Sequence, residues 1–248
     1  MIALLFLFET LFTPVASAAV QLEDPNTHVV RAKIFDEKNP AQTLFTFERI
    51  PLPSGENLKV VRSFKDAKGQ VVAVEEMFYE KAKLARLNID QTQIGEKGGF
   101  ELVGNKVSFF YTKNGETKKD DETIDDPLLC ADTVALHIHT NWDKLMAGEA
   151  LKVRMPVPAR LETIGFKFEK EKDATFEGKP VHVIKMSASS FIVRMAINPL
   201  YFYLDQGERK SVLKVVGRIV PKVQKDGKWT DMDAVSVFTH EEARAKKQ

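Results

Sequence analysis

The sequence predicts a mainly β (α+β) protein, in which one long, strongly curved antiparallel meander sheet forms a half-barrel that clasps a helix near 132–147. Short β-prone runs follow one another along the chain, and turn sequences such as Asn114-Gly115 join them. Helical periodicity is rare, so the chain lacks the many crossover helices that a parallel sheet needs, and a parallel-sheet fold is excluded. Runs such as 212–220 are apolar on both faces, so they need to be covered on both sides. A curved sheet that wraps around a helix provides this cover.

The strand runs begin at about residue 56, and we expect about ten of them, joined mostly by tight turns. The clearest runs are 58–64, 70–79, 100–103, 107–112, 164–176, 180–186, 200–204 and 211–220. Asp226-Gly227 indicates a further hairpin near the C-terminus. No segment repeats at a fixed period, which argues against solenoid and propeller folds. Residues 19–248 are therefore expected to form a single β-rich domain.

The main helix is expected at 132–147, where Asp132 can cap the first turn and Gly148 can end the helix. Its apolar stripe at helical spacing consists of Val134, Ile138, Trp142 and Leu145. A shorter helix is expected from 189 or 190 to 196. A capping-box pattern at 239–242 predicts a short polar C-terminal helix. The charged stretch 115–127 is expected to be a solvated loop.

Composition sets broad limits on function. The chain has 248 residues, of which 44% are hydrophobic, and its formal net charge is +1. That hydrophobic share can supply a core, which excludes wholesale disorder. A near-neutral charge argues against a dedicated nucleic-acid binder, because such proteins usually carry a basic excess or a basic stripe.

The N-terminus indicates export. The apolar run 2–8 is followed by Ala16-Ser17-Ala18, the small-residue pattern that precedes signal-peptidase cleavage. We therefore expect residues 1–18 to be a signal peptide, with cleavage near Ala18 and a periplasmic or secreted mature chain. A buried N-terminal helix is the alternative. The apolar run is too short to cross a bilayer, which requires roughly 20 residues, so no transmembrane segment is expected in the mature chain.

No metal or cofactor site is expected. His137 and His139 would point about 200° apart on a helix, so they cannot grip one ion together. The acidic run 120–126 lacks the alternating ligands and turn glycine of a calcium loop. The single cysteine, Cys130, lies in an apolar stretch with no basic neighbour, which favours burial as a small hydrophobe over a reactive thiolate.

No catalytic residue is selected by a motif. The sequence contains no Gly-x-Ser-x-Gly elbow, no Ser-x-x-Lys pair and no phosphate-binding loop. Paired carboxylates for glycoside hydrolysis depend on the fold, because their separation decides the chemistry. Glu75, Glu76 and Glu162 are conceivable partners, and nothing in the sequence singles them out.

Aromatic groups on the expected strands and helix suggest a site for an apolar ligand. The candidate ligand-binding residues are Trp142, Phe166, Phe168, Tyr201 and Tyr203. If the sheet encloses more volume than the helix fills, these side chains would line a pocket for a lipid or another apolar molecule. The alternative is that they are packed core, because an aromatic-rich strand set is also typical of a filled β core.

Several short segments resemble a broad family of exported bacterial β-rich proteins of unknown function. The resembling segments are Asn141–Leu145, Gly148-Glu149, Asn198–Asp205 and Gly217-Arg218. The resemblance covers roughly residues 45 to 225. It implies a curved antiparallel sheet and a periplasmic or outer-surface location. It implies no activity, so no catalytic residue is transferred. Periplasmic lipoprotein carriers share a half-barrel plan with a helix inside, which is an analogy of fold alone.

Three hypotheses about function follow. The first is a non-enzymatic envelope protein that binds an apolar ligand, such as a lipid, or an envelope partner protein on the concave face of the sheet. The second is an envelope hydrolase that acts on carbohydrate or peptide. The third is a structural or assembly protein whose strand edges dock on a partner.

Overall fold

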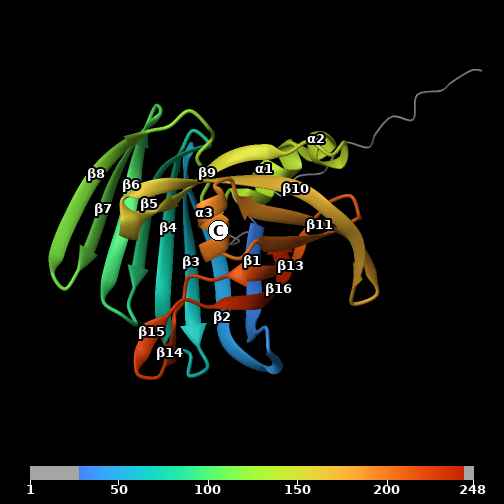
Figure 1. The fold of residues 1–248 in the computed structure, drawn as a ribbon, viewed down its shortest axis with the longest axis horizontal. Helices are drawn as coiled ribbons and strands as arrows, with labels where there is room; N and C mark the ends of the chain where they lie inside the picture. The colour runs from blue at the N-terminus through green and yellow to red at the C-terminus, as the bar shows by residue number, and fades with distance from the viewer. Residues whose placement is uncertain (1–27, 243–248) are drawn as a thin grey trace, which may run out of the picture.

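The computed structural model describes residues 28–242, and the expected signal peptide lies outside this range. Within it the chain is mainly β, with few and short helices, as the sequence predicts (Figure 1). The strands are β1 (His28–Asp36), β2 (Asn39–Ser54), β3 (Asn57–Asp66), β4 (Val71–Glu80), β5 (Lys83–Gln91), β6 (Glu96–Val103), β7 (Lys106–Lys113), β8 (Glu116–Thr123), β9 (Leu151–Val157), β10 (Glu162–Phe176), β11 (Lys179–Ala188), β12 (Leu200–Asp205), β13 (Val212–Arg218), β14 (Val223–Lys225), β15 (Lys228–Thr230) and β16 (Asp233–Glu242). The helices are α1 (Val134–Thr140), α2 (Trp142–Met146) and α3 (Phe191–Ala196), with a 3-10 turn at Pro158–Arg160.

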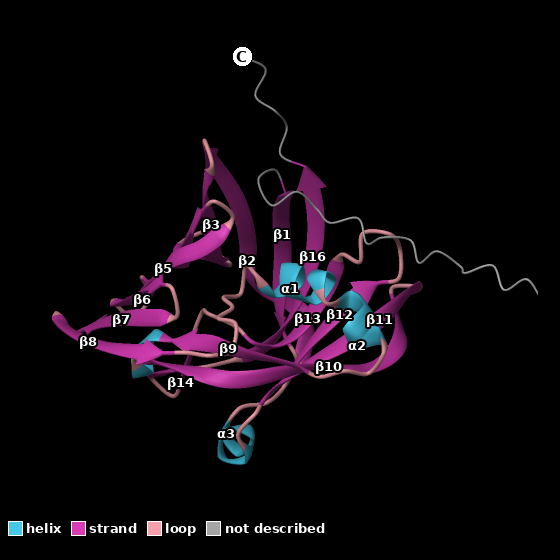
Figure 2. Ribbon diagram, turned by 90° about the horizontal axis from the view of Figure 1, so that it is seen from above, coloured by secondary structure: helices cyan, strands magenta, loops and turns pink. Residues whose placement is uncertain are grey.

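Fourteen strands form one antiparallel sheet in the order β8-β7-β6-β5-β4-β3-β2-β1-β16-β13-β12-β11-β10-β9. Nearly all neighbours in the sheet are also neighbours in sequence, and the exceptions arise where β16 joins β1 and β13. Seen from above, the sheet curves around the first two helices (Figure 2). The expected meander that wraps a helix is therefore confirmed.

The two ends of the sheet, β8 and β9, are joined by side chains rather than by a strand ladder. Glu122 of β8 accepts a hydrogen bond from the Thr163 backbone N–H of β10 at 2.6 Å. The same carboxylate forms a 2.7 Å ion pair with Arg154 of β9, and Arg154 also contacts the Thr163 hydroxyl. We call these three residues the Glu122 clasp. It acts beside the two backbone hydrogen bonds of Arg154, whose N–H donates to the Pro127 carbonyl and whose carbonyl accepts from the Leu129 N–H.

The expected 132–147 helix is two short helices, α1 and α2, that meet at Asn141. Their buried side chains include Val134, Ile138, Trp142 and Leu145, which are the four positions of the predicted stripe. These side chains pack against β9 to β12 through residues such as Phe168. Hydrophobic burial of this kind stabilises by about 25 cal/mol per Å² of apolar surface, so the stripe is what fixes the helices to the sheet.

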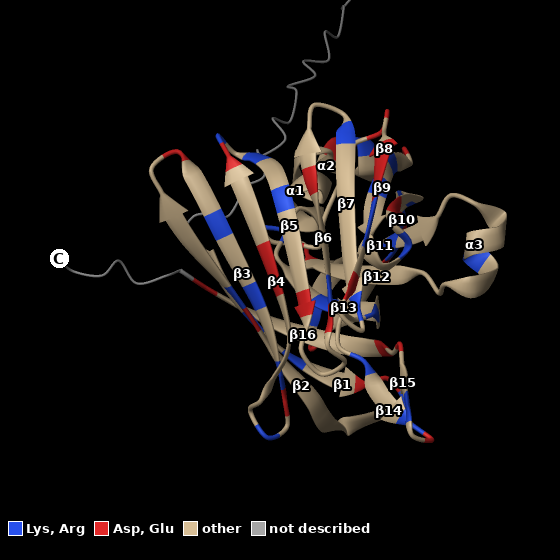
Figure 3. Ribbon diagram, turned by 90° about the vertical axis from the view of Figure 1, so that its left-hand side faces the viewer, with Lys and Arg blue, Asp and Glu red and all other residues tan. Residues whose placement is uncertain are grey.

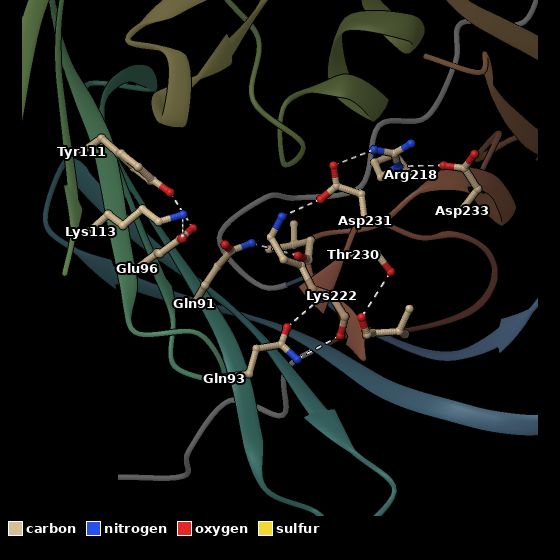
Figure 4. A network of polar contacts seen from close by, with 12 residues as sticks. Gln91, Gln93, Glu96, Tyr111, Lys113, Arg218, Lys222, Thr230, Asp231 and Asp233 are labelled. Carbon is tan, nitrogen blue, oxygen red and sulfur yellow. Dashed lines mark hydrogen bonds and ion pairs between the residues drawn. The ribbon is translucent and has the colours of Figure 1, made fainter. Parts of the chain in front are cut away.

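The end of the half-barrel away from α1 and α2 carries the segment with β14 and β15 (Figure 1), and side-chain contacts bind this segment to the sheet (Figure 4). The Gln93 side chain donates to the Lys222 carbonyl at 2.9 Å and accepts from the Lys222 backbone N–H at 2.6 Å. Gln91 donates to the Val220 carbonyl at 2.9 Å. Because paired amide bonds satisfy backbone groups that have no strand partner, they tie this segment to β5 and its following turn.

Strands begin earlier and are more numerous than expected: β1 and β2 precede residue 56, and residues 28–242 contain sixteen strands rather than about ten. Two further local expectations are wrong. Residues 116–123 form β8 instead of a solvated loop, because Asn114-Gly115 turns the chain back along β7. Its charged, exposed side chains suit the edge of a sheet. Residues 239–242 continue β16 instead of beginning a helix, because they pair with β1 in a continuous ladder. The bonds to β1 outweigh the local capping pattern.

Candidate functional site

A groove of about 820 Å³ lies on the outer face of the sheet, which we define as the face turned away from the core. Side chains alternate along a strand, so Ile34 of β1 points into the core and Phe35 points outward into the groove. On the neighbouring strand, Ala234 is buried in the core, while Val235 and Val237 line the groove. We call this the outer groove. Its floor is apolar, and its size falls in the range of small-molecule sites.

Lysine 214 of β13 lies at one side of the outer groove between two aromatic rings. Its ammonium nitrogen is 4.1 Å from the centre of the Tyr203 ring and 5.0 Å from the centre of the Phe176 ring. Phe176 ends β10 and reaches the groove from the β10–β11 hairpin. Partial burial lowers the pKa of Lys214. A partly dehydrated ammonium interacts with an anion more strongly than a fully hydrated one.

The remaining charges of the outer groove divide into paired and unpaired groups. Arg31 forms ion pairs with Glu48 at 2.9 Å and with Glu241 at 2.5 Å. Lys33, Lys65 and Lys214 line the same groove, and within residues 28–242 none of them has a carboxylate within ion-pair distance. Glu177 lines the groove as well, so three lysines without an ion pair and this one carboxylate lie beside the apolar floor. The excess of lysines leaves the groove attractive to an anionic group.

A second groove of about 490 Å³ lies on the outer face of β3 to β6 and differs in its charges. Lys59 and Arg86 both lie against the Phe78 ring, at 5.3 Å and 4.0 Å from its centre. Each of these cations has a carboxylate nearby, because Lys59 pairs with Glu76 at 2.7 Å and Arg86 lies 4.0 Å from Glu101. Its cations are therefore already neutralised, which makes this groove the weaker anion site.

A buried polar cluster lies on the inner face, where the chain enters α1. Asp132 accepts hydrogen bonds from Arg49 Nε at 2.6 Å and from the Tyr79 hydroxyl at 2.7 Å. Next to it, Arg62 forms a 2.7 Å ion pair with Glu75, and both side chains are nearly buried. Buried charges need such partners, since dehydration of an unpaired charge is costly. The cluster anchors the helical segment to β2, β3 and β4.

The titration of this cluster fits a structural role. Burial raises the pKa of Glu75, with Arg62 acting in the opposite direction. Burial, together with the nearby Asp132 carboxylate, raises the pKa of Cys130 to about 11. The thiolate is the reactive form of cysteine, so Cys130 stays protonated and unreactive at neutral pH. Its expected burial as a small hydrophobe is confirmed.

The histidines do not gather at one site. His182 of β11 hydrogen-bonds Asp173 at 2.6 Å and touches the Trp142 ring, with centroids 5.3 Å apart. His28 and His240 stack on one another at the β1–β16 pair. His139 is bonded to the Lys210 carbonyl at 2.9 Å. In the part of the chain that the structure describes, no group of three or more metal-ligating side chains comes together.

The five residues expected to bind a ligand lie on two different faces of the sheet. Trp142, Phe166 and Phe168 are buried together in the core beneath α1 and α2. Tyr203 is on the outer face, where its ring contacts Lys214, a residue that lines the outer groove. Tyr201, two residues earlier on β12, shares that outer face by strand alternation.

The three conceivable catalytic carboxylates are also apart. Glu75 is buried against Arg62 on the inner face. Glu76, the next residue on β4, is paired with Lys59 on the outer face. Glu162 begins β10 and is paired with Arg160 at 2.5 Å. The fold therefore does not bring these carboxyl groups to one cleft.

Sequence reasoning missed the outer groove because its lining comes from distant segments. Lys33, Lys214 and Val237 meet only after β16 pairs with β1 on one side and with β13 on the other. The sequence did offer one sign of the groove. Val235 and Val237 are two residues apart, a spacing that places both side chains on the same face of a strand.

No protein-family description matches this sequence, and no curated protein matches it. Among solved structures, a beta-barrel-like protein of a domain of unknown function from Brucella abortus aligns with 90% of this chain and 99% of its own, at 10% identity and a TM-score of 0.43. A putative outer membrane lipoprotein-sorting protein domain from Vibrio parahaemolyticus aligns with 92% and 89%, at 10% identity and a TM-score of 0.26. A DUF1329 family protein from Desulfovibrio piger aligns with 90% and 88%, at 8% identity and a TM-score of 0.26. Likenesses at these TM-scores do not indicate a shared function.

Proposed function

We propose that this protein is an exported, non-enzymatic binding protein that holds an amphipathic anion, an acyl chain with an anionic head group, in the outer groove. The observation that carries the proposal is Lys214, held between Phe176 and Tyr203 at the side of an apolar floor. The acyl chain would cover Phe35 and Val237, and the head group would lie near the lysines. Such burial removes apolar surface from water on both partners.

The charges of the outer groove support an anionic head group over a neutral one. Lys33 and Lys65 line the groove together with Lys214 and have no carboxylate partner among residues 28–242. A hydrogen bond to a charged group contributes about 1.5–3 kcal/mol. An anionic ligand gains this hydrogen-bond energy, and an uncharged ligand of the same chain length does not. The apolar floor contributes equally to the binding of the two ligands, so the lysines account for the difference in affinity.

The dense packing of the inner face also favours the outer groove as the binding site. The sequence-based hypothesis placed an apolar ligand between the concave face and the helix, and there Trp142, Phe166 and Phe168 are packed against one another and their neighbours. Close-packed side chains leave little room for a ligand. We therefore place the ligand on the opposite face of the same strands.

An envelope location is the second part of the proposal. It is supported by the apolar run and the Ala16-Ser17-Ala18 pattern of the N-terminus. Within the described residues, no helix is long and apolar enough to span a bilayer. Mass spectrometry of the protein from its host should find a mature chain that begins at Ala19. An intact N-terminus on the protein recovered from the cytoplasm would contradict export.

The binding proposal is tested by displacement of a fluorescent fatty acid. A long-chain fatty acid and the fatty alcohol of equal length are compared as competitors for wild type and for Lys214→Met. Methionine keeps an apolar side chain of similar length between the two rings and removes the charge. We expect fatty-acid affinity to fall at least about tenfold, as loss of one charge-assisted contact predicts, and alcohol affinity to stay unchanged.

The matched control is Lys228→Met, an exposed lysine of β15 outside the groove lining. It should bind both competitors as wild type does. A groove-filling variant, Val237→Glu, should abolish binding of the fatty acid by placing a negative charge on the apolar floor. Unchanged fatty-acid binding in Val237→Glu would refute the outer groove as the site.

A further inference from the structure

The helix α3 projects from the body of the protein (Figures 2 and 3), and its side chains are apolar except for Arg194. It lies between β11 and β12, and its segment Phe191–Ile197 has one charged residue, Arg194. Phe191, Ile192 and Met195 are 67%, 73% and 69% exposed. Val193 packs against the core. Apolar helix surface is normally buried in protein or in lipid, and the surface of Phe191, Ile192 and Met195 has no such cover among residues 28–242.

The single charge of α3 is turned toward its base. The Arg194 guanidinium lies 3.5 Å from the carbonyl oxygens of Ala188 and Ser189, where β11 ends and the helix begins. It also lies over the Phe191 ring, 6.0 Å from its centre. Long cationic side chains at a membrane surface behave in the same way, with an apolar stem inside and the charge at the polar boundary. The tip of α3 is left without charge.

The size and shape of the tip argue against a stable protein interface. Three side chains of about 200 Å² each, two thirds exposed, offer roughly 400 Å². A stable interface needs about 800 Å² from each partner. A convex tip that is exposed on every side except the one where Val193 meets the core is covered completely only by a medium that surrounds it.

The charges near α3 favour an anionic surface. Arg194 is the one charged residue of α3, and among residues 28–242 no carboxylate lies within ion-pair distance of it. Basic residues beside an apolar insertion strengthen binding to anionic lipids, because each one near the surface is attracted by its negative potential.

We propose that α3 is a membrane-docking element that inserts Phe191, Ile192 and Met195 into the interface of an anionic lipid bilayer. The residues involved are outside the outer groove lining, so docking and ligand binding are separable properties of the chain. Docking would bring the groove near a source or a recipient of its amphipathic ligand.

Co-sedimentation with vesicles tests the proposal. Wild type should sediment with vesicles that contain phosphatidylglycerol and much less with pure phosphatidylcholine. The triple variant Phe191→Ser, Ile192→Ser, Met195→Ser should bind the anionic vesicles at least about tenfold more weakly, because it loses the inserted apolar surface. Circular dichroism checks that this exposed replacement leaves the fold intact.

The matched control replaces three other exposed apolar side chains, Leu52, Val103 and Leu136, with serine. It should bind anionic vesicles as wild type does. A second variant, Phe191→Trp in a Trp229→Phe background, should shift its emission to shorter wavelength when anionic vesicles are added. An unchanged emission maximum, or equal loss of binding in the control triple, would overturn the proposal.

The remaining outcomes separate this proposal from the ligand proposal. The α3 triple variant should bind the fatty acid in solution with wild-type affinity. A wild-type protein that binds the fatty acid and ignores vesicles would overturn docking alone. Concentration-dependent dimerisation that the α3 triple variant abolishes would show that a second copy covers the helix, and would also overturn docking on lipid.

Discussion

The ion pair between Arg62 and Glu75 gives the sharpest prediction about stability. Their side chains are 13% and 6% exposed, and their charged atoms are 2.7 Å apart on adjacent strands β3 and β4. Glu75→Leu would leave the guanidinium buried without its carboxylate. Arg62→Met would leave the carboxylate buried without its cation and would also remove the contact of Arg62 with the Phe47 ring at 5.0 Å.

The magnitude follows from the cost of an unpaired buried charge. Removal of one partner of a buried ion pair typically costs about 3–5 kcal/mol of the free energy of unfolding. Replacement of both partners by apolar side chains of similar volume is often close to neutral. We therefore expect about 3 kcal/mol or more for each single variant, and about 1 kcal/mol or less for the double variant Arg62→Met, Glu75→Leu.

The assay is equilibrium unfolding in urea, followed by the fluorescence of the buried Trp142 and by circular dichroism. The four proteins form a double-mutant cycle, whose coupling energy is the quantity of interest. A coupling energy near zero, with single variants whose losses simply add, would refute the reasoning that the pair is mutually required in the core.

Three further predictions concern other parts of the fold. Burial raises the pKa of Cys130 to about 11, so iodoacetamide should alkylate the native protein slowly at neutral pH. Alkylation should become fast only when the pH approaches that value or when urea unfolds the chain. Fast alkylation of the native protein at neutral pH would contradict this prediction. Glu122→Ala should lower the free energy of unfolding by about 1–2 kcal/mol, measured by urea titration, whereas Glu116→Ala on the same strand should change little. Gly99→Ala should cost about 3 kcal/mol or more, since its β-carbon would lie 2.1 Å from a β5 carbonyl oxygen. Gly165→Ala, with its nearest atom at 3.6 Å, should be tolerated in thermal unfolding.

The fold class could be predicted because its signals are local. Asn114-Gly115 and Asp226-Gly227 both form tight turns with positive φ at each residue, as the dipeptides indicate. The apolar stripe of the helical segment identified its buried face correctly. The break at Asn141 was not predicted, since the apolar spacing runs through it without interruption.

Two boundaries were wrong because tertiary pairing decides them. The residues 239–242 carry a helix-capping pattern, but β1 offers a complete ladder of partners for them. The stretch 116–123 is polar on both faces, so hydrophobic alternation gives no sign of the strand β8. Edge strands of this kind are recognised from the hairpin turn before them rather than from their own side chains.

The candidate site could be predicted only in part for the same reason. Tyr203 stands out as an aromatic residue on a strand, but its partner Lys214 is identified only when β12 and β13 are paired in register. Phe176 joins them from the tip of a different hairpin. The sequence also does not reveal which face of β12 is the core, because both faces carry apolar or aromatic side chains.

We propose that the outer groove, rather than the helix-covered inner face, binds the acyl chain of an amphipathic anion. The most direct test is a crystal structure of the protein with a fatty acid that carries bromine at the end of its chain, located by anomalous scattering. We predict bromine density over Phe35 and Val237, with the carboxylate near Lys214. Bromine density among Trp142, Phe166 and Phe168 would contradict the account and place the ligand between the sheet and the helices.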